Sequence, residues 1–190
     1  MYIIEQNNKK SNLFYIKKSA RMKHKLIMII NSLGEGGVKI QTSGTTIIIE
    51  PYKDKVPARV KADIFIKTTS NETKVTADHL IKGPGEYEIQ GVEIVGFHPF
   101  IYRLKAEDIY LGFLGEHSSE ELARIDILFV DGNSEKAKII RQMEPKIVIV
   151  ISGEAEEIGR ELGLKSSKQD KVTLKKKDLV NQELQLIQLK

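Results

Sequence analysis

A cluster of short polar side chains directly after a buried strand is where this sequence could do chemistry. The stretch ADIFIKTTSNETK spans residues 62–74, and its apolar run ends at Ile66. Side chains that follow buried strands commonly form the active site of α/β proteins. The polar set has no His, Cys or Asp and consists of Thr69, Asn71, Glu72, Thr73 and Lys74. Its hydroxyls have no neighbouring His to activate them, so covalent catalysis has little support.

The histidines are the next candidates, and none is paired with another at metal-ligand spacing. The chain has four, which are His24, His79, His98 and His117. His79 is expected in a short connector, and His98 precedes a proline, which favours an extended or turn conformation. His117 follows Glu116 and is the one histidine that merits a catalytic hypothesis. Its position just before an expected helix is explained better by a structural role, which we favour.

A carboxylate site for magnesium or manganese is an alternative, because hard cations accept shells made only of oxygen. Its ligands would be Glu72, Glu116 and Asp131, which form no recognised motif. Asp131 also has a simpler interpretation, as the first residue of a turn from a strand into a helix. In that case Asn133 or Ser134 would cap the helix.

Length and composition indicate one soluble globular domain. The chain has 190 residues, of which 41% are hydrophobic and 29% are charged, as in ordinary proteins with a buried core. It has no cysteine, so disulfides and thiolate metal sites are excluded and a reducing compartment is compatible. Its longest apolar run, residues 26–30, is far too short to cross a bilayer, and no signal peptide follows from it. We therefore expect a cytoplasmic protein without membrane contact.

The basic character of the chain belongs to its first residues. The net charge is +4, yet residues 1–25 contain seven of the 30 Lys and Arg and only one of the 26 Asp and Glu. Residues 1–24 are therefore expected to be a basic extension, disordered or upstream of a true start at Met22, and residues 25–190 to be the domain. Nucleic-acid binding would depend on this extension alone, since the domain itself is close to neutral.

The first half of the domain has the pattern of β-structure. Short β-branched runs, separated by Gly and Ser turns, predict strands over residues 25–30, 38–41, 46–50 and 64–67. Alternating residues on both sides of Gln90-Gly91 predict a hairpin of strands 86–89 and 92–95. Another pair is expected over residues 102–105 and 109–114.

The second half alternates between strands and helices. All-apolar runs predict buried strands over 127–130 and 147–151, and the tail predicts strands over 172–175 and 183–189. Capping and periodicity predict helices that begin at 118–121 and that span 134–143 and 154–162. Such alternation is typical of a sheet with helices packed on it.

The order of these pieces resembles the metallo-β-lactamase fold superfamily, and most closely its compact bacterial branch with the ascorbate-phosphate lactonase-like proteins. The resemblance covers residues 25–190 and rests on the ADI strand, KIQTSGTTIIIEPY, GPGEYE, Leu114-Gly115-Glu116 and EPKIVIVIS. It implies an α/β protein, an αββα four-layer sandwich with two sheets face to face and helices outside. It also implies a dinuclear metal site at one sheet edge.

The same resemblance implies that this metal site has been lost. Active members carry His-x-His-x-Asp-His after the ADI strand, a bridging Asp after Leu-Gly and a last His after the later apolar strand. Imidazole and carboxylate ligands are needed there because zinc is bound by nitrogen and oxygen and activates water. In this chain the corresponding positions are Thr69, Asn71, Thr73, Lys74, Glu116 and Ser152. We therefore expect neither a bound metal nor another cofactor.

Three functions remain as hypotheses. The first is a non-catalytic pseudo-enzyme of the zinc-dependent hydrolase superfamily, which would bind a small molecule or a protein or serve a structural role. The second is a metal-dependent hydrolase of a phosphorylated or lactone-like small molecule, with an atypical oxygen-rich site around Glu116. The third is a nucleic-acid-binding protein that uses the basic extension.

Overall fold

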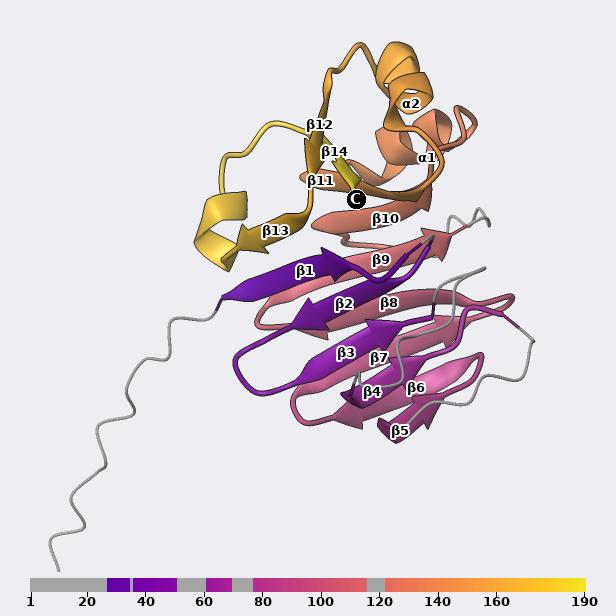
Figure 1. Ribbon diagram of the computed structural model, residues 1–190, viewed down its shortest axis with the longest axis vertical. Helices are drawn as coiled ribbons and strands as arrows, with labels where there is room; N and C mark the ends of the chain where they lie inside the picture. The colour runs from indigo at the N-terminus through magenta and orange to yellow at the C-terminus, as the bar shows by residue number, and fades with distance from the viewer. Residues whose placement is uncertain (1–26, 35, 51–60, 70–76, 116–121) are drawn as a thin grey trace, which may run out of the picture.

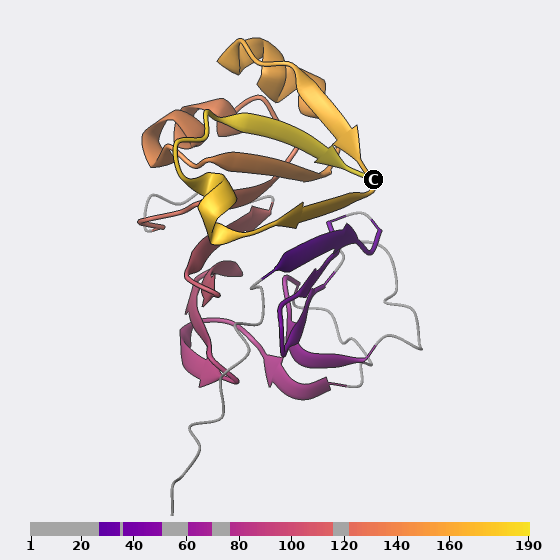
Figure 2. The ribbon, with the colours of Figure 1, turned by 90° about the vertical axis from the view of Figure 1, so that its left-hand side faces the viewer.

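The computed structural model describes residues 27–34, 36–50, 61–69, 77–115 and 122–190. Over these ranges the chain forms two β-sheets that lie face to face, with two α-helices on the outside (Figures 1 and 2). The expected α/β sandwich is therefore confirmed. No helix of the described residues is long and apolar enough to cross a membrane.

The first sheet has six strands in the order β13-β1-β2-β3-β4-β5. Their bounds are β1 (Met28–Ser32), β2 (Val38–Gln41), β3 (Thr46–Ile49), β4 (Ala62–Ile66), β5 (Ala77–Ile81) and β13 (Lys171–Leu174). β1, β2 and β3 pair antiparallel, whereas β3, β4 and β5 pair parallel. It follows that β1, β3, β4 and β5 all end at the same edge of this sheet.

The second sheet has eight strands in the order β12-β14-β11-β10-β9-β8-β7-β6. Their bounds are β6 (Gly85–Ile89), β7 (Val92–Phe97), β8 (Ile101–Ala106), β9 (Ile109–Gly115), β10 (Ile127–Asp131), β11 (Ile147–Ser152), β12 (Ser166–Gln169) and β14 (Gln185–Leu189). β6 to β9 form an antiparallel meander, and β9, β10, β11, β14 and β12 pair parallel. The predicted hairpin turn is present, and both Gln90 (φ 50°) and Gly91 (φ 78°) have the positive φ of a two-residue turn.

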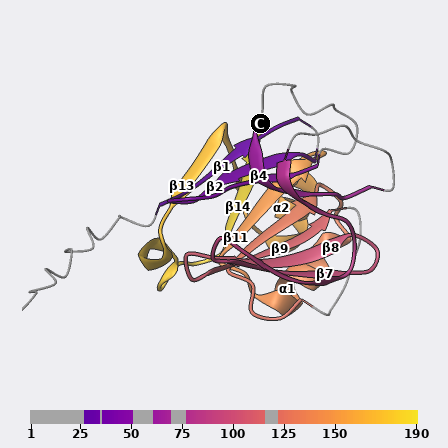
Figure 3. The same ribbon diagram turned by 90° about the horizontal axis from the view of Figure 1, so that it is seen from below.

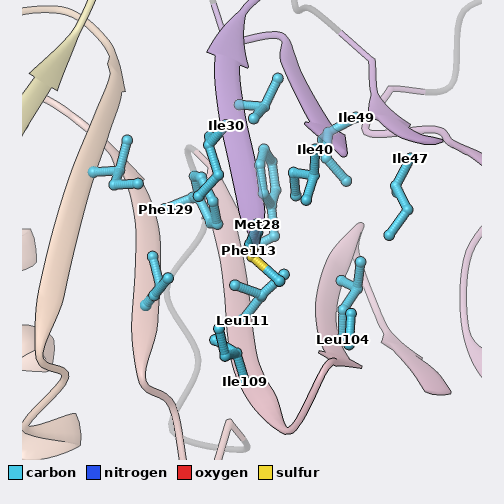
Figure 4. Packing of buried hydrophobic residues seen from close by; sticks show 14 of the residues in the cluster. Met28, Ile30, Ile40, Ile47, Ile49, Leu104, Ile109, Leu111, Phe113 and Phe129 are labelled. Atoms are coloured by element: carbon cyan, nitrogen blue, oxygen red, sulfur yellow. The ribbon is translucent and has the colours of Figure 1, made fainter. Parts of the chain in front are cut away.

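The all-apolar strands β10 and β11 are buried on both faces. One face of β10 presents Phe129 to the core between the sheets, where its ring stacks on Phe113 with centroids 5.6 Å apart. Figure 4 shows Met28 and Ile30 of β1 beside these two rings. The other face presents residues such as Leu128 to the helices. Burial on two faces explains why these runs do not alternate with polar residues.

The helices α1 (Lys136–Met143) and α2 (Ala155–Leu162) lie on the outer face of the eight-stranded sheet. Seen from below, β1, β2 and β4 lie on one side and β7, β8 and β9 on the other, with α1 beyond them (Figure 3). α2 ends at Gly163, whose φ of 70° is left-handed, a conformation that favours glycine. A 3₁₀ helix, η1 (Lys176–Leu179), connects β13 towards β14.

Two strands and one cap differ from the sequence prediction. β5 and β12 were not predicted, and His79, expected in a connector, lies in β5. The predicted side-chain cap of α1 is also wrong, because the helix begins at Lys136 without one. Instead, Asn133 Oδ1 accepts a hydrogen bond from the backbone N–H of Glu135 (2.9 Å), which closes a turn before the helix. The helix start predicted at 118–121 lies outside the described residues.

Candidate functional site

The strands that were expected to carry the site end at one edge of the sandwich, which we call the carboxyl edge. It consists of the residues that follow β3, β4, β9, β10 and β11, and Figure 1 shows β1, β3, β9 and β10 pointing the same way. The two sheets meet there, because Gly36 in the β1–β2 turn donates its backbone N–H to the carbonyl of Ile151 (2.9 Å). Ends of parallel strands are a usual place for a binding site.

A buried polar group lies where β3 and β4 end, and we call its residues, Glu50, Lys67, Thr68 and Thr69, the Glu50 cluster. Glu50 Oε2 accepts hydrogen bonds from the Thr68 backbone N–H and from the Thr69 hydroxyl, each at 3.2 Å. The Thr68 hydroxyl donates to the Glu50 carbonyl (2.9 Å), and Lys67 Nζ lies 4.0 Å from Glu50 Oε1. The side chains of Glu50 and Lys67 are only 4% and 9% exposed. The cluster thus combines one carboxylate with an ammonium and two hydroxyls.

Tyr102 of β8 joins the end of β4 to the turn before β6. Its buried hydroxyl donates a hydrogen bond to the carbonyl of Lys67 (2.7 Å) and accepts one from the backbone N–H of Gly83 (3.0 Å). Burial raises the pKa of Tyr102, although the Gly83 N–H opposes this rise. The phenol therefore remains protonated near neutral pH and acts as a structural donor.

A second ion pair, with a buried lysine and a partly exposed aspartate, lies where β10 ends and α1 begins. Lys136 Nζ lies 3.4 Å from Asp131 Oδ1, and the side chain of Lys136 is only 3% exposed. Asp131 stands opposite Ser152 in the register of β10 and β11, and the backbone N–H of Gly132 donates to the Ser152 carbonyl (2.6 Å). Asp131, considered above as a magnesium ligand, is thus already beside an ammonium group.

Two of the six positions expected to mark the former metal site are described by the structure. Thr69 belongs to the Glu50 cluster, and Ser152 ends β11. The other four lie outside the described residues and are Asn71, Thr73, Lys74 and Glu116, as do Glu72 and His117. That the six share one pocket stays a prediction. His79 and His98 are both exposed.

The described side chains of the carboxyl edge do not fit zinc. Zinc in proteins is bound by imidazole, thiolate or carboxylate, whereas Thr69 and Ser152 offer neutral hydroxyls. The two carboxylates, Glu50 and Asp131, each have an ammonium nitrogen within 4.0 Å, which would lie beside a dication. Within the described ranges, no three His, Cys, Asp or Glu side chains are close enough to hold a metal ion.

The sequence reasoning singled out Thr69 and Ser152 but not the groups around them. It missed Glu50, Lys67 and Lys136 as buried charges and Tyr102 as the donor between segments. The sequence contains one signal for Glu50. It directly follows the run TTIII, which predicts a buried strand, so its carboxylate is expected at the end of that strand. The sequence gives no comparable signal for Tyr102, whose importance depends on the pairing of β8.

Comparison with known proteins gives matches in structure but not in sequence. No protein-family model and no curated protein matches the chain. A proposed zinc-dependent hydrolase of the metallo-β-lactamase superfamily from Thermotoga maritima matches with a TM-score of 0.68 and 20% identity, over 85% of this chain and 100% of its own. A proposed metal-dependent hydrolase from Parabacteroides distasonis matches with a TM-score of 0.58 and 17% identity, over 86% of this chain and 94% of its own.

A third solved structure is described by its fold rather than by an activity. The metallo-β-lactamase fold protein YhfI from Bacillus subtilis matches with a TM-score of 0.56 and 12% identity, over 85% of this chain and 96% of its own. All three identities are low, so these likenesses bear on the architecture and not on the chemistry. The resemblance inferred from sequence is confirmed at that level. The chain has the metallo-β-lactamase fold.

Proposed function

We propose that this chain is a metallo-β-lactamase-fold protein that has lost its metal ligands and works without catalysis, as a binding or structural module. The observation that carries the proposal is the position of Thr69, where the family alignment places the first histidine. Its hydroxyl donates to Glu50, inside a cluster that also contains Lys67. If the alignment holds, a former ligand position belongs to a hydrogen-bonded structural group, which supports the proposal.

The sequence of the remaining positions supports the same proposal. A catalytic zinc needs about three protein ligands and an open position for water. The aligned residues offer an amide, a hydroxyl, an amine and one carboxylate, which are Asn71, Thr73, Lys74 and Glu116. Without a metal, nothing in this set lowers the pKa of an attacking water. The binding partner would be a small molecule or a protein, and the absence of cysteine supports a cytoplasmic location.

A metal-dependent hydrolase is the second candidate, favoured by the similar folds of the Thermotoga and Parabacteroides proteins, which are described as hydrolases. In that case Glu116 would contribute a carboxylate to an atypical oxygen-rich site. Its substrate would be a phosphorylated or lactone-like small molecule.

Metal analysis of protein purified without chelator separates the two candidates. We expect no stoichiometric zinc and no hydrolysis of phosphodiester, lactone or thioester substrates, because the ligand count is too low. A variant with all six aligned positions restored should gain metal affinity; its substitutions are Thr69→His, Asn71→His, Thr73→Asp, Lys74→His, Glu116→Asp and Ser152→His. Stoichiometric zinc in the native protein, with activity that Glu116→Ala abolishes, would instead establish the hydrolase.

Residues 1–24 are proposed to be an extension outside the domain. Deleting them is expected to lower the melting temperature by less than about 2 °C, because a charged terminal segment adds little buried apolar area. Differential scanning calorimetry of the shortened and the full chain measures this directly. A drop of 10 °C or more would mean that residues 13–16, the apolar run LFYI, pack on the domain.

A further inference from the structure

We propose that Lys67 and Lys136 are internal cations that take over, at the carboxyl edge, the charge balance that a metal provides in a zinc-dependent site. This inference deepens the proposed function and rests on it. Each lysine is buried and lies within 4.0 Å of one carboxylate, so a positive charge already stands where a divalent cation would bind.

Burial is the first support. Lysine is almost never fully buried unless its charge is paired, since removing an ammonium from water is costly. The two side chains are nevertheless only 9% and 3% exposed. A lysine side chain is long enough to extend its ammonium group into water. Two lysines that stay buried at one edge therefore each require a favourable partner.

The partners are the second support, because each pair joins two segments that end or begin at the carboxyl edge. Glu50 follows β3 and Lys67 follows β4, so their pair connects neighbouring strand ends of the six-stranded sheet. Asp131 ends β10 and Lys136 begins α1, so their pair connects a strand of the other sheet to its helix. One pair therefore stands at the edge of each sheet.

The position of the ammonium groups is the third support. Each pair places an ammonium nitrogen within 4.0 Å of its carboxylate, so a dication bound to that carboxylate would lie beside a positive charge. The Glu50 carboxylate is further occupied by the N–H of Thr68 and the hydroxyl of Thr69. These donors occupy one oxygen of the carboxylate, which a metal would otherwise have to share with them.

A double-mutant cycle on Asp131 and Lys136, the closer pair, tests the proposal by urea denaturation. Lys136→Met removes the charge at similar length and is expected to raise the unfolding equilibrium constant on the order of a hundredfold, because Asp131 is left as an uncompensated charge. Adding Asp131→Asn to Lys136→Met should recover most of that loss. The control is Lys168→Met, which breaks exposed pairs with Glu156 (3.2 Å) and Glu154 (3.6 Å) and should change the constant less than about fivefold.

The metal readout uses Mn²⁺ alone. Millimolar Mn²⁺ should leave the denaturation midpoint of the native protein unchanged and should raise that of Lys136→Met, whose carboxylate has lost its internal cation. Should Lys136→Met fail to fold, Asp131→Asn removes the carboxylate that lies 3.4 Å from the buried ammonium and should raise the unfolding constant at least tenfold.

The failures of this inference and of the proposed function are distinguishable. Native-like stability of Lys136→Met or of Asp131→Asn, or no recovery in the double variant, overturns the inference while the protein stays free of metal. Zinc bound stoichiometrically to the native protein contradicts the proposed function whatever the cycle shows.

Discussion

Replacing Gly132 by alanine is expected to destabilise the protein by about 3 kcal/mol, near the upper end for overpacking a close-packed site. Gly132 lies between the end of β10 and the turn that leads to α1. A Cβ at this position would lie 2.6 Å from the carbonyl oxygen of Glu154 and closer still to the Glu154 nitrogen. Both are backbone atoms, so no flexible side chain can move aside.

The expected damage from Gly132→Ala reaches the carboxyl edge itself. Its backbone N–H holds the Ser152 carbonyl, and the residue before it pairs with Lys136. Displacing the turn would therefore loosen β10 from β11 at the point where both strands end. Urea denaturation measures the loss, because the midpoint falls while the slope changes little for a two-state protein.

Gly44→Ala is the matched control for that substitution. An added Cβ there has no heavy atom within 4 Å, and Gly44 is not in the left-handed region. We expect a change of no more than about 1 kcal/mol in either direction. Equal effects of Gly132→Ala and Gly44→Ala would show that the close approach of Glu154 is relieved at little cost.

The apolar strands were predictable because a run of apolar residues predicts a buried strand from the local sequence alone. β10 and β11 are apolar up to their last residue, and alternation on both sides of Gln90-Gly91 predicts the hairpin of β6 and β7. β5 and β12 carry no such pattern. β12 reads SSKQ and has no apolar residue, so its strand conformation comes from pairing with β14. Tertiary pairing of this kind overrides local propensity.

The candidate site was predictable in part, and only through family resemblance. The structure has Thr69 shortly after the end of β4 and Ser152 as the last residue of β11, while their role as former metal positions stays a prediction. The resemblance could not indicate that Glu50 lies beside Lys67, since these residues are 17 positions apart and meet through the parallel register of β3 and β4. The burial of Lys136 was equally hidden, because it depends on where α1 begins.

Tyr102→Phe is expected to destabilise the protein by about 3 kcal/mol. The substitution removes the hydrogen bond to the Lys67 carbonyl and takes away the acceptor of the buried Gly83 N–H. A buried donor left without its acceptor costs about 1–3 kcal/mol, to which the second lost bond adds about 1 kcal/mol. Phenylalanine keeps the aromatic ring, so the packing of this side chain against the core should change little. Urea denaturation at pH 7 gives the measurement.

The control for Tyr102→Phe is Tyr87→Phe in β6, two strands away in the same sheet. The Tyr87 hydroxyl makes an exposed contact of 3.4 Å with the Pro84 carbonyl, so its removal should cost less than about 0.5 kcal/mol. If Tyr87→Phe destabilised the protein as much as Tyr102→Phe, the loss of stability would not be specific to the two hydrogen bonds of Tyr102.

The pH dependence separates the Tyr102 hydroxyl from a mere packing effect. Burial raises the pKa of Tyr102 above 10.0, the ordinary value that it regains in the unfolded chain. Below pH 10 both states keep the proton, and the hydroxyl contributes its full stabilisation. Above pH 10 the unfolded state binds fewer protons than the folded one, so this contribution is lost as the pH rises through the folded pKa. The stability gap between the native protein and Tyr102→Phe should therefore narrow from pH 9 to pH 11. Parallel stability profiles over this range would contradict the assignment of the phenol as a buried, protonated donor.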